Sequence, residues 1–380
     1  MKIRLFKPKI GKLELLEIKK VFKKSWLGYG EKVQLFEDKW SKFIDSKYSI
    51  ALNSCTAALH LSLAVNNFKK NKKVLVPAIT FSATAAAALY CDLIPVFVDV
   101  NRDTLVMDFE DLKKKYTKDC VAVIPVHLGG QPCEMEKIIP WAKKNKIIVI
   151  EDCAETAGGM YKGKKLGTWG DFGCFSFEEK KIMTTGDGGM ICTNNKKKYL
   201  KLKSISFHGW NKDPWLRHKS SLKTKSKNHW EYSIDKLGYK YNMNDLAASI
   251  GLAQLKKIRL LNTSREKIIK RYIQGIKNLK NINILTDYKL DNSSYWLFVI
   301  RCNKRDALMN YLKLNKISSA VHFEPLPMQP LYKKYKSIIP NAKETWKKII
   351  SLPLFPDLKF SEVDYIVNKL KLFDKNYSKY

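Results

Sequence analysis

The feature that most constrains the fold is a regular alternation of short apolar runs with longer stretches of helical periodicity. The apolar runs lie at 48–52, 74–77, 94–100, 121–126 and 147–150, and the helical stretches between them lie at 56–67, 82–90, 107–116 and 134–145. Short, almost continuous apolar runs are typical of strands that are buried on both faces. Because strands that alternate with helices form parallel sheets, the pattern predicts an α/β protein with helices on both faces of its sheet.

The segments around this alternation predict a second, smaller unit. Apolar residues at helical spacing indicate two helices, 11–24 and 30–45, before the first strand. Short strands are expected within 171–193, an exposed polar excursion over 211–236, one or two long helices over 244–276, strand-like runs at 296–302 and 317–323, and a helix over 361–372. The long helices are a natural bridge, so we expect a large domain over 1–255 and a small C-terminal α/β domain over 256–380.

The charge of the chain is strongly positive but dispersed. Lys and Arg total 70 against 36 Asp and Glu, a net charge of +34, yet only 8 of the 70 are Arg. A protein that reads nucleic acid usually concentrates its charge on one face and brings Arg or aromatic residues to it. Scattered lysine pairs therefore favour solvated faces and no nucleic-acid partner. The positive field would still attract an anionic substrate such as a nucleotide diphosphate.

Three further features predict a cytoplasmic protein without metal or membrane partners. No apolar run approaches the roughly 18 residues that a membrane span requires. The first twenty residues lack the continuous apolar core of a secretion signal. The eight cysteines are scattered singly without a CxxC pair, which is typical of free thiols in a reducing compartment and gives no support for zinc.

Polar residues follow the first two strands where a ligand of a parallel sheet would bind. After the first strand, the segment 53–59 (NSCTAAL) offers small hydroxyl residues and the positive end of a helix, which together suit a phosphate group. Ser54 fits a plain N-cap equally well. After the second strand, Phe81 places an aromatic ring near the same edge, although core packing would also explain it.

The residues after the fifth strand supply an acid and a basic nucleophile. Asp152 leaves an apolar strand end, where a carboxylate is costly to bury unless it meets a cation, such as a protonated ring nitrogen. The glycine-flanked segment 175–189 carries adjacent lysines, Lys180 and Lys181, and a desolvated lysine amine can act as a nucleophile. A phosphate site, a stacking aromatic, an acid for a pyridinium nitrogen and a lysine for a Schiff base are the parts of a pyridoxal 5′-phosphate site.

At these residues the chain resembles the DegT/DnrJ/StrS family of pyridoxal-phosphate-dependent nucleotide-sugar aminotransferases, essentially from end to end. The matching segments are 25–30, 53–59, 76–81, 125–132, 151–155, 170–177, 181–189, 237–243, 247–255 and 351–356. The motif FSF-x3-K followed by GDGG is the most specific of them. It selects Lys181 rather than Lys180.

The resemblance implies a fold-type I transferase with a mostly parallel seven-stranded sheet, and a homodimer whose subunits share their active sites. It also implies a role for each matched residue. Lys181 bonds to the cofactor and moves the proton, Asp152 pairs with the pyridine nitrogen, Phe81 stacks on the ring, Glu155 lies near the phenolic oxygen, Cys55, Thr56 and Ser176 hold the phosphate, and Asn242, or its neighbour Lys240, reaches the phosphate of the partner subunit.

Three positions depart from the family pattern. Cys55 stands where glycine is commoner, and Asp187 replaces the commoner glutamate. Pro327 stands where many members carry a histidine close to the sugar. Related dehydratases carry histidine at the lysine position, so Lys181 favours the transaminase reaction.

The expected reaction moves an amino group from L-glutamate to a nucleoside-diphosphate 4-keto-6-deoxy sugar, which gives a perosamine- or viosamine-type 4-amino sugar. Within the family the alternative is a 3-keto sugar or the scyllo-inosose branch. From another class, the alternative is a basic regulatory or nucleic-acid-binding protein that keeps the fold without the chemistry. An amino-acid aminotransferase that uses no sugar is the third alternative.

Overall fold

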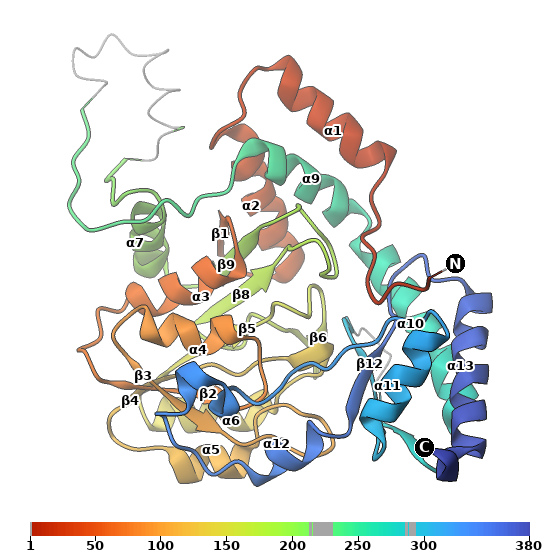
Figure 1. Cartoon of the computed structure of the whole chain (residues 1–380). Helices are drawn as coiled ribbons and strands as arrows, with labels where there is room; N and C mark the ends of the chain where they lie inside the picture. The colour runs from red at the N-terminus through yellow and green to blue at the C-terminus, as the bar shows by residue number, and fades with distance from the viewer. Residues whose placement is uncertain (1, 213–214, 216–230, 286–287, 289–293) are drawn as a thin grey trace.

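Seven strands form the central sheet of the structure, a computed structural model that describes residues 2–212, 215, 231–285, 288 and 294–380 (Figure 1). The strand order is β1-β9-β8-β5-β4-β2-β3. The strands span β1 (Tyr48–Leu52), β2 (Lys73–Pro77), β3 (Ile94–Val98), β4 (Cys120–Val123), β5 (Ile148–Asp152), β8 (Phe172–Ser176) and β9 (Gly189–Thr193). Of these seven, β9 alone runs antiparallel to its neighbours, β1 and β8. The predicted α/β class with a mostly parallel sheet is therefore confirmed.

Helices surround this sheet and continue into the C-terminal part. Their bounds are α1 (Lys12–Lys23), α2 (Glu31–Ile44), α3 (Cys55–Ala64), α4 (Ser82–Leu89), α5 (Phe109–Lys115), α6 (Met135–Lys144), α7 (Lys196–Ser206), α9 (Asp245–Lys256), α10 (Ile258–Ile276), α11 (Arg305–Leu314), α12 (Pro340–Thr345) and α13 (Phe360–Lys375). In the parts of the chain that the structure describes, no helix combines the length and apolar character needed to cross a bilayer.

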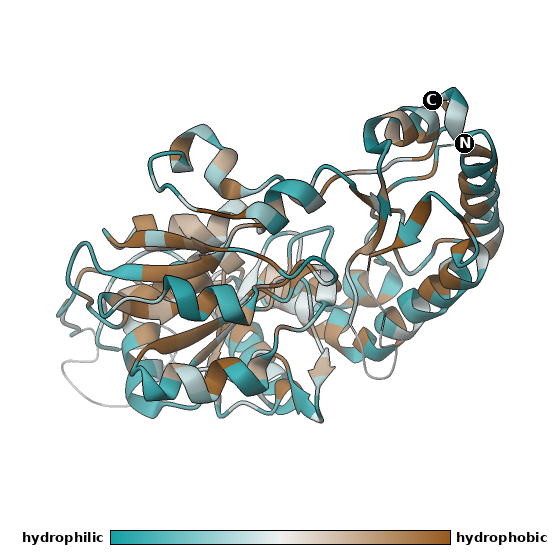
Figure 2. Cartoon of the chain, turned by 90° about the horizontal axis from the view of Figure 1, so that it is seen from below, coloured by the Kyte–Doolittle hydropathy of each residue, from teal (hydrophilic) through white to brown (hydrophobic). Residues whose placement is uncertain are grey.

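The core lies between the sheet and its helices, as the apolar strands require. All residues of β8 and β9 are buried, and only the first residue of β1 and of β2 is partly accessible. The ring of Trp40 of α2 lies 5.0 Å from the ring of Phe175, which belongs to β8, and 5.0 Å from that of Phe177, which directly follows β8. Figure 2 shows these strands as a hydrophobic layer inside helices whose outer faces are hydrophilic.

A second core belongs to the C-terminal unit. Its antiparallel sheet has the order β10 (Ile282–Ile284), β11 (Phe298–Cys302) and β12 (Ile349–Leu352), and α10, α11 and α13 pack around it. The N-terminus also lies here, because Ile3 bridges to Ile317 (Figure 1). The division of the chain between residues 255 and 256 stays a prediction.

One of the expected strands is wrong, and one expected segment lies mostly outside the described residues. The run 317–323 is not a strand: it makes only isolated bridges, Ile3 to Ile317 and Ala320 to Ser351. In the small sheet β12 pairs with β11, and this run pairs with β12 only through the bridge from Ala320. Most of the predicted excursion over 211–236 lies outside the described residues. The helical stretch after 244 is two helices, which meet at Lys257.

Candidate active site

One cavity, of about 570 Å³, lies where the carboxyl ends of β1, β2, β5 and β8 meet. Parallel strands direct their carboxyl ends to the same sheet edge, so the residues that follow them converge although they are distant in sequence. Seven of the eight residues predicted for the site line this cavity: Cys55, Thr56, Phe81, Asp152, Glu155, Ser176 and Lys181.

The loop between β8 and β9 directs Lys181, rather than Lys180, to the acidic residues. The Nζ atom of Lys181 lies 3.6 Å from the Oε1 atom of Glu155, and only 14% of its side chain is exposed. The side chain of Lys180 is 55% exposed and pairs with Glu178. The buried guanidinium of Arg265 donates to the backbone carbonyls of the Lys181 turn and helps to hold it.

Asp152 is a buried carboxylate at the end of β5. Its Oδ2 atom accepts a hydrogen bond from the Thr84 hydroxyl at 2.8 Å, and its Oδ1 atom accepts one from the backbone N–H of Ala154 at 3.1 Å. Burial raises the pKa of the Asp152 carboxyl, while the Thr84 and Ala154 hydrogen bonds and the charge of Lys181 oppose that rise. A positively charged group in the cavity would therefore stabilise the carboxylate.

The raised pKa of Asp152 has a consequence for the protein without cofactor. The unfolded chain ionises this carboxyl at lower pH than the folded chain does, so stability is lost as the pH rises through the folded-state pKa. Asp152→Asn removes this loss. We expect its free energy of unfolding, measured in urea, to gain on that of the wild type as the pH rises from acidic to neutral. A difference that shrinks with rising pH would contradict the burial argument.

The start of α3 forms a cradle of the kind that binds phosphate. The hydroxyl of Ser54 accepts the N–H of Ala57 at 3.1 Å, so Ser54 is the N-cap, and the first-turn N–H groups that follow have no helical partner. A Cβ atom on Gly189 would lie 2.3 Å from the backbone of Ser54, so only glycine lets β9 begin this close to the helix. Burial holds the pKa of the Cys55 thiol well above its ordinary value, which leaves the backbone N–H of Cys55 as its contribution.

Phe81 presents its ring to the cavity instead of to the core. It immediately precedes α4, and 58% of the residue is exposed, whereas Phe172 and Phe175 of β8 are buried. Its ring centroid lies 5.9 Å from that of Phe323 on the opposite wall. Core packing, the alternative considered from the sequence, does not explain an exposed ring at this place.

These groups fit the phosphorylated pyridine cofactor that the sequence predicts. The cavity brings together the amine of Lys181, the buried carboxyl of Asp152 and the exposed ring of Phe81. It also includes the N-terminus of α3, which Gly189 approaches closely. Each of these groups matches one part of pyridoxal phosphate: its carbonyl, its ring nitrogen, its ring face and its phosphate.

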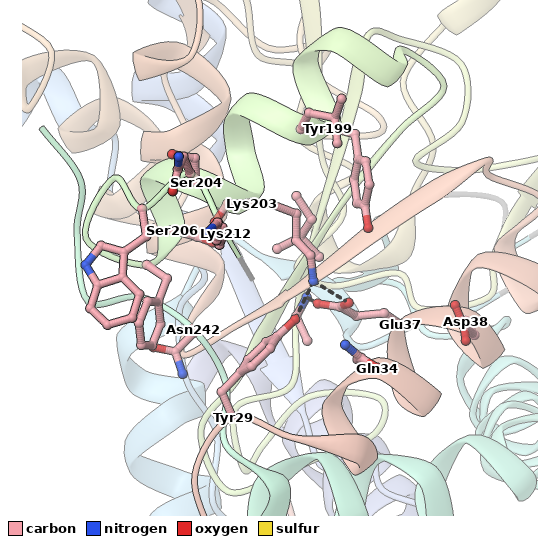
Figure 3. A pocket seen from close by; sticks show the side chains of 16 residues that line it. Tyr29, Gln34, Glu37, Asp38, Tyr199, Lys203, Ser204, Ser206, Lys212 and Asn242 are labelled. Atoms are coloured by element: carbon pink, nitrogen blue, oxygen red, sulfur yellow. Dashed lines mark hydrogen bonds and ion pairs between the residues drawn. The ribbon is translucent and has the colours of Figure 1, made fainter. Parts of the chain in front are cut away.

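Asn242 is the one predicted residue that its own chain does not bring to this cavity. It lines a different cavity, of about 470 Å³, together with residues of α2 and α7 such as Glu37 and Lys203 (Figure 3). Its Oδ1 atom accepts a hydrogen bond from Lys240 at 2.8 Å. The resemblance assigned Asn242 to the site of the partner subunit, so this role stays a prediction.

The structure adds residues that the sequence reasoning missed. Trp296 and His322 of the C-terminal unit line the cavity, and Thr84 binds Asp152 from α4. The Nδ1 atom of His322 lies 2.9 Å from the Ser351 hydroxyl oxygen. Burial and the charge of Lys181 lower the pKa of His322 to about 4, which leaves a neutral imidazole in the cavity at neutral pH. Trp296 and His322 lie in the strand-like runs 296–302 and 317–323, and nothing in those runs marked them as site residues.

A cluster of His127, Glu151 and Cys153 resembles a metal site in composition, within the described residues. Its oxygen and nitrogen atoms already have partners. His127 accepts the N–H of Cys133 and contacts Glu151, whose two oxygens accept the N–H groups of Gly167, Trp169 and Gly170. The cluster therefore fixes the loop 167–170 against β5.

Comparison with known proteins matches nearly the whole chain. The model of the DegT/DnrJ/EryC1/StrS aminotransferase family matches residues 8–371. GDP-perosamine synthase of Escherichia coli O157:H7 is 32% identical over 375 residues, with 98% of each chain covered. The spore coat polysaccharide biosynthesis protein SpsC of Bacillus subtilis is 34% identical over 377 residues, with 96% of this chain and 95% of its own covered.

A solved structure agrees with these sequence matches. Spr1654 of Streptococcus pneumoniae, described as a sugar aminotransferase, is 30% identical. Its pyridoxamine phosphate form gives a TM-score of 0.91 and covers 98% of this chain and 99% of its own. Its pyridoxal phosphate form gives a TM-score of 0.89.

Proposed function

The chain belongs to the DegT/DnrJ/EryC1/StrS aminotransferase family, and we propose that it moves an amino group from L-glutamate to the keto carbon of a nucleoside-diphosphate 4-keto-6-deoxy sugar. It is a sugar aminotransferase that depends on pyridoxal phosphate. Membership in this enzyme family therefore argues against the alternative of a regulatory protein that keeps the fold but has no catalytic activity. The observation that carries the proposal is the single cavity that joins Lys181, Asp152 and the start of α3.

The residues of the cavity divide the work between binding and proton transfer. When bound, pyridoxal phosphate supplies an electron sink for the carbon that loses a proton. Lys181 would hold the cofactor covalently, and its amine would then move a proton at the substrate carbon. Asp152 would keep a proton on the ring nitrogen, Phe81 would cover the ring, and the first turn of α3 with Ser176 would bind the phosphate.

One observation supports a sugar of the 4-keto type, and another supports an anionic nucleotide sugar. GDP-perosamine synthase resembles this chain over 98% of both lengths, and perosamine is a 4-amino sugar. The charge of +34 would attract a dianionic nucleotide sugar.

The likeness to SpsC supports a further proposal, that the amino sugar serves polysaccharide synthesis. All eight cysteines are free thiols, which supports a reducing compartment such as the cytoplasm.

A panel of nucleotide keto-sugars tests this proposal. The purified enzyme is incubated with L-glutamate and each 4-keto or 3-keto sugar nucleotide, and mass spectrometry follows the exchange of oxygen for an amino group. We expect amination of a 4-keto-6-deoxy sugar and none with Lys181→Ala, the matched control. Amination of only 3-keto sugars would replace the proposed substrate, and amination of none of the sugars would contradict a sugar substrate.

We also propose that two subunits share each active site, with Asn242 contributed by the partner. Lys181→Ala and Asn242→Ala subunits should each be inactive alone, because each lacks one part of every site. Mixing equal amounts should restore about a quarter of the wild-type activity, since half of the dimers then contain one intact site of two. Activity assays on the mixture, with native mass spectrometry to count heterodimers, measure this.

The control is a subunit that carries both changes. Mixed with Asn242→Ala subunits, it supplies no intact Asn242 and should restore nothing. If Asn242→Ala is inactive alone and demonstrable heterodimers with Lys181→Ala stay inactive, the shared site is wrong.

A further inference from the structure

The Nζ atom of Lys181 contacts two groups that both favour a positive charge. The Oε1 atom of Glu155 is 3.6 Å away. The ring centroid of Trp296 is 3.9 Å away, within the range of a cation–π contact. The two contacts come from different parts of the chain, since Glu155 follows β5 and Trp296 precedes β11.

Trp296 is held in place by contacts that do not involve the amine. One face of its ring stacks on Phe6 of the N-terminal segment, with centroids 4.9 Å apart and planes 2° from parallel. Its Nε1 atom donates a hydrogen bond to the backbone carbonyl of Lys180 at 2.7 Å. The ring is 4% exposed. Its position beside Lys181 is therefore set in advance and requires no rearrangement.

Glu155 is equally constrained. Its Oε2 atom accepts the N–H of Gly129 at 2.5 Å, which leaves Oε1 directed to Lys181. Burial raises the pKa of this carboxyl, and the nearby charge of Asp152 adds to the rise, while Lys181 and the Gly129 N–H oppose it. Lys181 also interacts with the carboxyl of Asp152, the thiol of Cys55 and the neutral imidazole of His322. Burial therefore makes the Glu155 carboxyl a better proton acceptor than an exposed glutamate.

We propose that Trp296 and Glu155 hold the Lys181 ammonium group whenever the lysine is not bonded to the cofactor, and that Glu155 takes the proton which turns that group into a base. The proton passes from Nζ to Oε1, which leaves a neutral amine and a protonated carboxyl. Trp296 acts through Lys181 and is a positioning residue. This inference rests on the role proposed above for Lys181.

The test measures the protonation of Lys181 directly, in the full-length enzyme loaded with pyridoxamine phosphate, where the lysine is free. Wild type, Trp296→Phe, Trp296→Leu and Glu155→Gln are pulsed with acetic anhydride across pH, and peptide mass spectrometry gives the labelling of each lysine. Only the neutral amine reacts, so the pH of half-maximal labelling reports protonation, whereas the plateau reports access.

We expect Trp296→Leu and Glu155→Gln to label Lys181 about five- to tenfold faster at neutral pH, because each loses a contact that favours the ammonium form. Their half-maximal pH should fall, and Trp296→Phe should stay close to wild type because it keeps an aromatic face. Lys180, measured in the same spectra, should not change and is the internal control.

Two outcomes would overturn the inference. If Phe and Leu at position 296 shift the midpoint equally, the hydrogen bond to Lys180 and not the ring positions the amine. If no variant shifts the midpoint, neither residue holds the ammonium group. A separate arm uses enzyme loaded with pyridoxal phosphate, in which Lys181 should resist labelling. Full labelling there would refute the proposed role of Lys181 itself.

Discussion

Lys181→Ala should abolish amino transfer, with a loss of about 10⁴-fold or more in kcat. The change removes both the covalent attachment of the cofactor and the amine that moves the proton, so both half-reactions should fail. Single-turnover assays with L-glutamate alone and with the keto sugar alone measure the two losses separately. Borohydride treatment of the wild-type holoenzyme should fix the cofactor mass on the peptide that contains Lys181.

Lys180→Ala is the matched control, since it is the adjacent residue with the same side chain. Lys180 is 55% exposed and pairs with Glu178, so its removal breaks only a surface ion pair, which is worth at most about 1 kcal/mol. Activity should stay within a few-fold of wild type. If Lys180→Ala were inactive and Lys181→Ala active, or if the cofactor mass were found on Lys180, Lys181 would not be the nucleophile.

Much of the large sheet was predictable because its strands are buried on both faces. A strand such as β1 or β2 is then apolar over most of its length, and that pattern can be recognised in the sequence alone. The small sheet is antiparallel, and the pattern at 317–323 resembled a strand although the chain there makes only isolated bridges. Whether such a run pairs depends on neighbours far away in sequence, which periodicity does not contain.

The candidate site likewise contains some residues that could be predicted from the sequence and others that could not. Asp152 and the start of α3 follow apolar strands directly, so the rule that ligands bind at the carboxyl ends of strands located them. Trp296 and His322 come from the C-terminal unit and reach the cavity only through tertiary packing. Thr84 was missed because a threonine inside an alanine-rich helix has no pattern of its own. Its role exists only because Asp152 lies 2.8 Å away.

Asp152→Asn should keep part of the cofactor but lose about 10²–10³-fold in kcat. The amide has nearly the shape of the carboxyl and can keep the hydrogen bond with the Thr84 hydroxyl, so the cavity should stay intact. It cannot stabilise a protonated ring nitrogen, however, and the substrate carbon then loses its electron sink. Steady-state kinetics and the absorbance of bound cofactor measure the two effects separately.

The same variant should separate stability from activity. Without cofactor it should be more stable than wild type at neutral pH, because it no longer buries an ionised carboxyl whose pKa burial has raised. With cofactor the order should reverse, since only the carboxylate gains a cationic partner at the ring nitrogen. Thr84→Val, which removes one hydrogen bond but keeps the charge, should show a smaller loss of kcat and no reversal. Near-normal turnover in Asp152→Asn would mean that the ring nitrogen does not lie beside β5.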